Sequence, residues 1–175
     1  MHWVAFGILL YVVTVLQTAL APHLAIHAAR PNMMVIVAAY YALTARTHDA
    51  LLACWIIGLV IDLTSLSYHD HGNVGLSALT LGCIAMLIVR AREFAVRDSV
   101  LTHLIFTAAA TMALSTAVGS HMLWIRGDWT RFSDVLALSF YTAIYTGVLA
   151  PYAHWILRRT RNLLGIGPTH RLRVR

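Results

Sequence analysis

The sequence predicts an all-α membrane protein: a bundle of about six transmembrane helices with both termini in the cytoplasm. Hydrophobic residues make up 59% of the 175 residues and charged residues only 11%, and the mean hydropathy is +0.72. A soluble domain of this size cannot bury so much apolar surface, whereas lipid accepts helices whose backbone groups bond internally. The apolar residues form six segments, and the arginines are distributed unevenly around them.

The six apolar segments cover about residues 3–21, 32–45, 50–66, 76–89, 100–125 and 135–157. A helix that crosses the hydrocarbon core needs ~20 residues, so we expect the second and fourth segments to include flanking residues or to meet a thinner bilayer. The first segment has an alternative interpretation as a signal peptide, because Ala19-Leu20-Ala21 has the form of a cleavage site. The absence of a preceding basic residue, the length of the segment and Pro22 after the site oppose that interpretation.

The arginines predict the orientation of the chain. With a cytoplasmic N-terminus, ten arginines lie on the cytoplasmic side: Arg46, Arg90, Arg92, Arg97, Arg158, Arg159, Arg161, Arg171, Arg173 and Arg175. Only Arg30, Arg126 and Arg131 lie on the outer side. This excess follows the positive-inside rule and supports an even number of spans. The net charge of +6 therefore reports orientation, and we expect no nucleic-acid partner.

The chain divides into a single transmembrane domain, residues 1–157, and a basic cytoplasmic tail, residues 158–175. The tail carries six arginines and no acidic residue. Juxtamembrane arginines are attracted to anionic headgroups, so anionic lipids are the expected partner of the tail, with docking onto a cytoplasmic protein as the alternative.

Small residues recur every four positions on three segments, which lets a neighbouring helix approach closely. These ridges are Ala50, Cys54 and Gly58; Thr107, Thr111, Ser115 and Gly119; and Ser139, Ala143 and Gly147. Asp62 continues the first ridge, so it should face the bundle interior. It either accepts hydrogen bonds from Thr64, Ser65, the following loop or Ser77, or it acts as a partner-binding or ion-coupling carboxylate.

The sequence gives little sign of catalytic chemistry. His69, Asp70 and His71 form only a partial metal site, even if His23 or His27 supplies a third ligand, so we expect a solvated loop and no metal. No nucleophile-elbow, zinc-protease or nucleotide-binding motif is present. We therefore expect no enzyme activity and no cofactor.

Other residues that often carry chemistry are expected to have structural roles. Cys54 and Cys83 should act as small hydrophobic residues. The histidines near segment ends, His103, His121 and His154, are expected to lie at the membrane interface, as are Trp3, Trp124, Trp129 and Trp155.

The order "RPNMMVIVAAYYAL", "GLVIDLTS" and "GLSALTLGCIAMLIVRAR" resembles the MreD family of rod shape-determining proteins, most closely over residues 31–92. In the resemblance, Pro31 corresponds to the proline that opens the second span. Gly58 and Asp62 correspond to the glycine and aspartate of the third span, and Gly75 to the glycine that opens the fourth. Asn32 departs from the acidic residue common after that proline.

The resemblance implies a non-enzymatic protein of the bacterial inner membrane that supports lateral peptidoglycan synthesis. Its implied partner is the bitopic protein MreC and, indirectly, MreB, RodA and the elongation transpeptidase. The small-residue ridges would then serve either internal packing or capture of the transmembrane helix of MreC. The family also resembles the substrate-binding subunits of energy-coupling-factor vitamin transporters, and such a subunit is the alternative.

Overall fold

The structure is a computed structural model of the whole chain, in which residues 2–26, 29–65, 75–92 and 100–160 are described. These residues form six α-helices and a short 3₁₀-helix. The helices are α1 (Trp3–Ala19), α2 (Met33–Thr44), α3 (Thr47–Ser65), α4 (Leu76–Ala91), α5 (Val100–Arg126) and α6 (Phe132–Arg159), with η1 (Trp129–Arg131) between the last two. The all-helical fold class is therefore confirmed for the described part of the chain, and each predicted apolar segment overlaps one helix.

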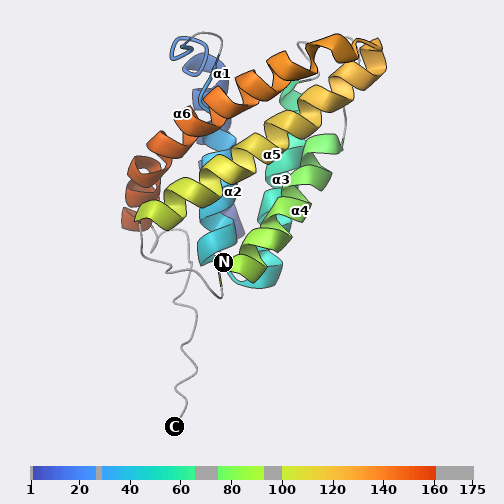
Figure 1. The fold of residues 1–175 in the computed structure, drawn as a ribbon. Coiled ribbons are helices and arrows are strands. Elements are labelled where there is room, and N and C mark those ends of the chain that lie inside the picture. Colours follow the sequence, from blue (N-terminus) through green and yellow to red (C-terminus); the bar gives the residue numbers. More distant parts are fainter. Residues whose placement is uncertain (1, 27–28, 66–74, 93–99, 161–175) are drawn as a thin grey trace.

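Consecutive α-helices run in opposite directions (Figure 1). α5 and α6 form a long antiparallel pair that runs obliquely to the other helices; both pack against α2, and α5 also packs against α4 (Figure 1). The N-terminal end of α1 lies at the same end of the bundle as the C-terminal end of α6 (Figure 1). Three helices, α3, α5 and α6, are long and apolar enough to cross a membrane; α1, α2 and α4 are shorter apolar helices.

The short helix α2 is the centre of the bundle. It packs against all five other α-helices, and its residues Met34–Leu43 are all buried. The segment was expected to include flanking residues or to meet a thinner bilayer. The helix ends at Thr44 and has 12 residues, or ~18 Å of helix, so it does not include flanking residues, and the thinner bilayer stays a prediction. Because protein surrounds α2, its ends can meet other helices instead of lipid.

Hydrogen bonds from distant residues fix both ends of α2. At its start, Asn32 caps the helix through Oδ1, which accepts from the Val35 N–H at 3.2 Å, and Gln17 Oε1 accepts from the Met33 N–H at 2.7 Å. At its end, the buried Arg92 side chain donates to the carbonyls of Ala42 and Ala45 at 2.9 and 2.6 Å. Arg92 thus stabilises the α2–α3 turn in addition to contributing to the charge asymmetry.

Candidate functional site

Three of the four residues singled out from the sequence meet at one contact between α3 and α4. Asp62, with 1% of its surface exposed, accepts hydrogen bonds from the backbone N–H groups of Gly75, Ser77 and Ala78 at 2.8, 3.1 and 3.3 Å. The first N–H groups of a helix lack partners within the helix, and their positive ends stabilise a carboxylate. Asp62 therefore caps α4 from the preceding helix.

The two glycines explain how the Asp62 carboxylate reaches α4. Gly75 adopts φ +95°, a left-handed conformation that costs glycine little and turns its N–H toward Asp62. One turn before Asp62, a Cβ on Gly58 would collide with the Ala78 Cα and lie 2.7 Å from the Ser77 carbonyl oxygen. Only glycine fits there, so Gly58 sets the close approach of the two helices. Below, these residues are called the α3–α4 junction.

The junction bears on the two interpretations of Asp62. Of the expected donors, Ser77 does bond to Asp62, although through its backbone N–H, whereas the Thr64 hydroxyl donates to the carbonyls of Val60 and Ile61. The geometry accounts for the buried carboxylate by capping. A role of Asp62, Gly58 or Gly75 in partner contact stays a prediction.

Pro31 lies apart from the α3–α4 junction, two residues before α2. It is buried, and its carbonyl accepts from Gln17 Nε2 at 3.2 Å. The next residue, Asn32, donates its backbone N–H to Thr146 Oγ1 of α6 at 3.1 Å. These bonds join α1, the start of α2 and the middle of α6. The pairing could not be predicted from the sequence, because the partners are far apart in the chain.

The small-residue ridges lie mostly inside the bundle. Ala50, Cys54, Thr107, Thr111, Ser139 and Ala143 are buried. A Cβ on Gly147 of α6 would lie 2.9 Å from the Ala108 Cβ of α5, and one on Gly119 would collide with Val135. Of the two uses considered for the ridges, these contacts support internal packing and not the capture of a partner's transmembrane helix.

Two histidines expected at the membrane interface are instead buried against each other. His103 Nδ1 of α5 and His154 Nδ1 of α6 are 2.8 Å apart, and His154 Nε2 lies 3.0 Å from the Ile36 carbonyl oxygen of α2. Because that carbonyl only accepts, His154 Nε2 donates to it, and the two Nδ1 atoms form one hydrogen bond between the rings. The pair thus joins three helices. Trp3, Trp124, Trp129 and Trp155 are exposed, and their place at the membrane interface stays a prediction.

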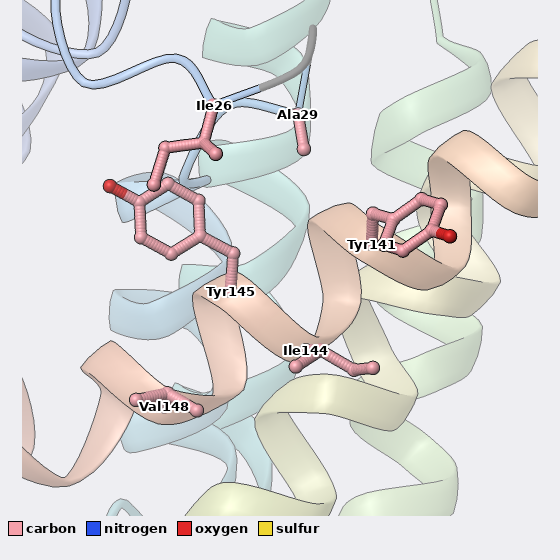
Figure 2. A pocket seen from close by; sticks show the side chains of 6 residues that line it. All are labelled: Ile26, Ala29, Tyr141, Ile144, Tyr145 and Val148. Carbon is pink, nitrogen blue, oxygen red and sulfur yellow. The ribbon is translucent and has the colours of Figure 1, made fainter.

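A groove of about 620 Å³ opens on the outward side of α6. It is lined by Ile26 and Ala29 of the α1–α2 connection and by Tyr141, Ile144, Tyr145 and Val148 of α6 (Figure 2). Ile26 and Ala29 exchange both backbone hydrogen bonds at 3.0 Å, and Tyr145 donates through its hydroxyl to the Leu24 carbonyl at 3.1 Å. The connection is therefore held against α6 as one wall of the groove.

The groove is apolar along most of its lining. The Tyr145 ring lies beside the Ile26 side chain, and Tyr141, Ile144 and Val148 project from α6 along its length (Figure 2). These residues could not be predicted from the sequence as a binding surface, because the sequence does not show which face of α6 points outward. The His69–Asp70–His71 loop and residues 161–175 of the tail lie outside the described residues, so the predictions for them stay predictions.

Comparison with known proteins gives one match. The chain matches the family described as rod shape-determining protein MreD over residues 1–160. No curated protein and no solved structure is significantly similar to it. The match covers nearly all of the described helices and agrees with the resemblance found at residues 31–92. The chain is a member of the MreD family, a family of rod shape-determining membrane proteins.

Proposed function

We propose that the chain is a multi-pass protein of the bacterial inner membrane that acts without catalysis in lateral peptidoglycan synthesis. The family match carries this proposal, because it covers residues 1–160 and names rod shape determination. Six antiparallel apolar helices and the excess of arginines at one end support six spans with both termini in the cytoplasm.

The partner we propose is the single transmembrane helix of an MreC-like bitopic protein, bound in the groove on α6. MreB, RodA and the elongation transpeptidase would then be reached indirectly through that partner. A bitopic protein offers one apolar helix to the membrane, and the groove presents an apolar strip along the length of another helix. The ridges cannot serve in its place, since they are already occupied by packing inside the bundle.

The tyrosines of the groove favour a protein occupant over lipid. α6 has 28 residues and is ~42 Å long, so Tyr141 lies only ~7 Å from its midpoint. The side chain is 63% exposed, and its hydroxyl has no partner among the described residues. A hydroxyl facing hydrocarbon loses its hydrogen bond to water, whereas a partner helix can offer a carbonyl or a serine or threonine side chain.

We also propose that the arginine-rich tail binds anionic lipid on the cytoplasmic side. Arg158 and Arg159 end α6, and four further arginines follow before the C-terminus. Juxtamembrane arginines each gain ~1 kcal/mol at an anionic surface. The tail would thereby orient α6 while leaving its outward face available to the partner.

The test is a crosslinking experiment in cells at native expression level. A photoreactive amino acid is placed at Ile144 in the groove or, as a control, at Leu87, an exposed apolar residue of α4. We expect Ile144 to crosslink to a single-span periplasmic protein and Leu87 not to do so. Equal crosslinking, or crosslinking of the two positions to lipid alone, would contradict the groove.

A second variant measures the consequence for the complex. Val148→Trp fills the groove, and Leu87→Trp adds the same bulk on α4. We expect Val148→Trp to lower co-purification of the partner about tenfold, which corresponds to ~1.4 kcal/mol, and Leu87→Trp to leave it unchanged. Recovery of a coupling membrane subunit with ATPases from the unmodified protein would support the vitamin-transporter alternative instead.

A further inference from the structure

A second pocket, lined by both polar and apolar residues, lies beside the α1–α2 connection, at the end of the bundle where α1 and α3 end and α2 begins. Its volume is about 200 Å³. Gln17 and Thr18 come from α1, Arg30 and Asn32 from the connection, and Met34 and Thr64 from α2 and α3. With the orientation proposed above, this end of the bundle faces the periplasmic leaflet. Below it is called the Arg30 pocket.

Arg30 is the charged group of this pocket. Its side chain is exposed, and it has no hydrogen bond or ion pair with any described residue. The buried Arg92, by contrast, donates to the backbone carbonyls of Ala42 and Ala45. The Arg30 guanidinium is thus a planar cation with its N–H donors available to a ligand.

The polar groups around Arg30 add donors. Asn32 Oδ1 accepts from the Val35 N–H, so the orientation of the amide is fixed and its Nδ2 has no partner among the described residues. Gln17 holds this arrangement in place through its bonds to Pro31 and Met33. The first turn of α2, which includes Met34, adds the positive end of the helix dipole.

No carboxylate lines the pocket among the described residues. Asp62 follows the lining residue Ile61 in the chain, but its oxygens are bonded to the N–H groups of α4. The hydroxyls of Thr18 and Thr64 donate to carbonyls of their own helices, so they add no charge. Among the described residues that line the pocket, Arg30 is therefore the only charged side chain, and the charge of this lining is positive.

We propose that the Arg30 pocket binds a phosphate group. Arginine matches the geometry of phosphate oxygens through paired N–H donors, and Asn32 Nδ2 supplies a further donor beside it. The pocket lies where α1 and α3 end and α2 begins, and the phosphate of a phospholipid headgroup is the expected ligand for an arginine of a membrane protein. A soluble phosphate ester carries the same group and is the other source that the test distinguishes.

The test compares full-length protein with three variants. Arg30→Gln removes the charge, and Arg30→Lys keeps the charge without the paired donors. Arg126→Gln is the matched control, because Arg126 ends α5 at the same end of the bundle and does not line the pocket. In the lipid arm, each protein is reconstituted with phosphatidylglycerol and retained lipid is counted by native mass spectrometry. In the soluble arm, inorganic phosphate is titrated in lipid-free detergent and thermal stabilisation is measured.

We expect Arg30→Gln to retain about tenfold less lipid than the unmodified protein, Arg30→Lys an intermediate amount, and Arg126→Gln the unmodified amount. Stabilisation by inorganic phosphate that is lost only in Arg30→Gln, without lipid retention, would support the site and assign it a soluble ligand. Equal losses in Arg30→Gln and Arg126→Gln in both arms would overturn the proposal, since binding would then follow total charge alone.

Discussion

At the α3–α4 junction, Gly58 lies against the backbone of Ala78, whereas on α6 the side chains of Ile144 and Val148 face an open groove. Both regions belong to apolar helices, and composition alone does not distinguish them. The junction has no room for a Cβ at Gly58, and the Asp62 carboxylate accepts from three backbone N–H groups. The groove has room, and the Tyr141 hydroxyl on its rim has no partner among the described residues. Small residues at buried positions thus let the helices of the bundle pack closely, whereas large residues on the outward face of α6 line the groove that we propose as the partner site.

The largest effect should come from filling the junction. Gly58→Val places side-chain atoms where the Ala78 Cα and the Ser77 carbonyl now lie, so α3 and α4 must separate. We expect a loss of more than ~3 kcal/mol in the free energy of unfolding and little folded protein in the membrane. Size-exclusion chromatography and the melting temperature in detergent measure this.

The matched control for Gly58→Val is Gly82→Val on α4. A Cβ at Gly82 meets nothing nearer than Trp55 Cδ1, at 3.9 Å, so the substitution should be tolerated. Equal destabilisation at the two glycines would mean that the valine side chain, and not the close approach of α3 to α4, determines the loss.

A smaller effect is expected at Asp62, whose carboxylate accepts from three N–H groups. Asp62→Asn keeps one oxygen but points an NH₂ group toward donors, so at least one N–H of α4 loses its acceptor. We expect a loss of ~2 kcal/mol, measured by thermal unfolding. Co-purification of the partner by the folded fraction should be unchanged.

The opposite outcome for Asp62→Asn would also be informative. Normal stability combined with lost partner binding would show that the charge of Asp62 takes part in partner binding. The α3–α4 junction would then be a binding region as well, and not only a structural one. Ser77→Ala serves as the control, because Asp62 bonds to the backbone of Ser77 and not to its hydroxyl.

The helices and the buried orientation of Asp62 were predictable from the sequence because they depend on local spacing. The capping of α4 by Asp62 was not, since it depends on how α4 packs on α3. Apolar segments fix where helices form, and the four-residue spacing from Ala50 to Asp62 places the carboxylate on the buried face. The bond between His103 and His154 was not predictable, since it joins residues 51 positions apart whose contact depends on how α5 packs on α6. The groove depends likewise on where the α1–α2 connection lies, which no local pattern encodes.

The smallest effect should come from the wall of the groove. Tyr145→Phe removes the bond from the Tyr145 hydroxyl to the Leu24 carbonyl, which ties the α1–α2 connection to α6. That bond is solvent-accessible in the described structure, so we expect at most ~1 kcal/mol of lost stability, with partner co-purification reduced a few-fold as the wall loosens.

Tyr141→Phe tests the contact with the occupant of the groove without changing the wall of the groove. The Tyr141 hydroxyl bonds to no described residue, so its removal should leave the melting temperature unchanged. A partner helix that accepts from this hydroxyl would bind Tyr141→Phe more weakly, whereas lipid in the groove would make the substitution neutral or favourable. Unchanged co-purification in both tyrosine variants would therefore locate the partner elsewhere, because neither the shape nor the polar rim of the groove would then matter to it.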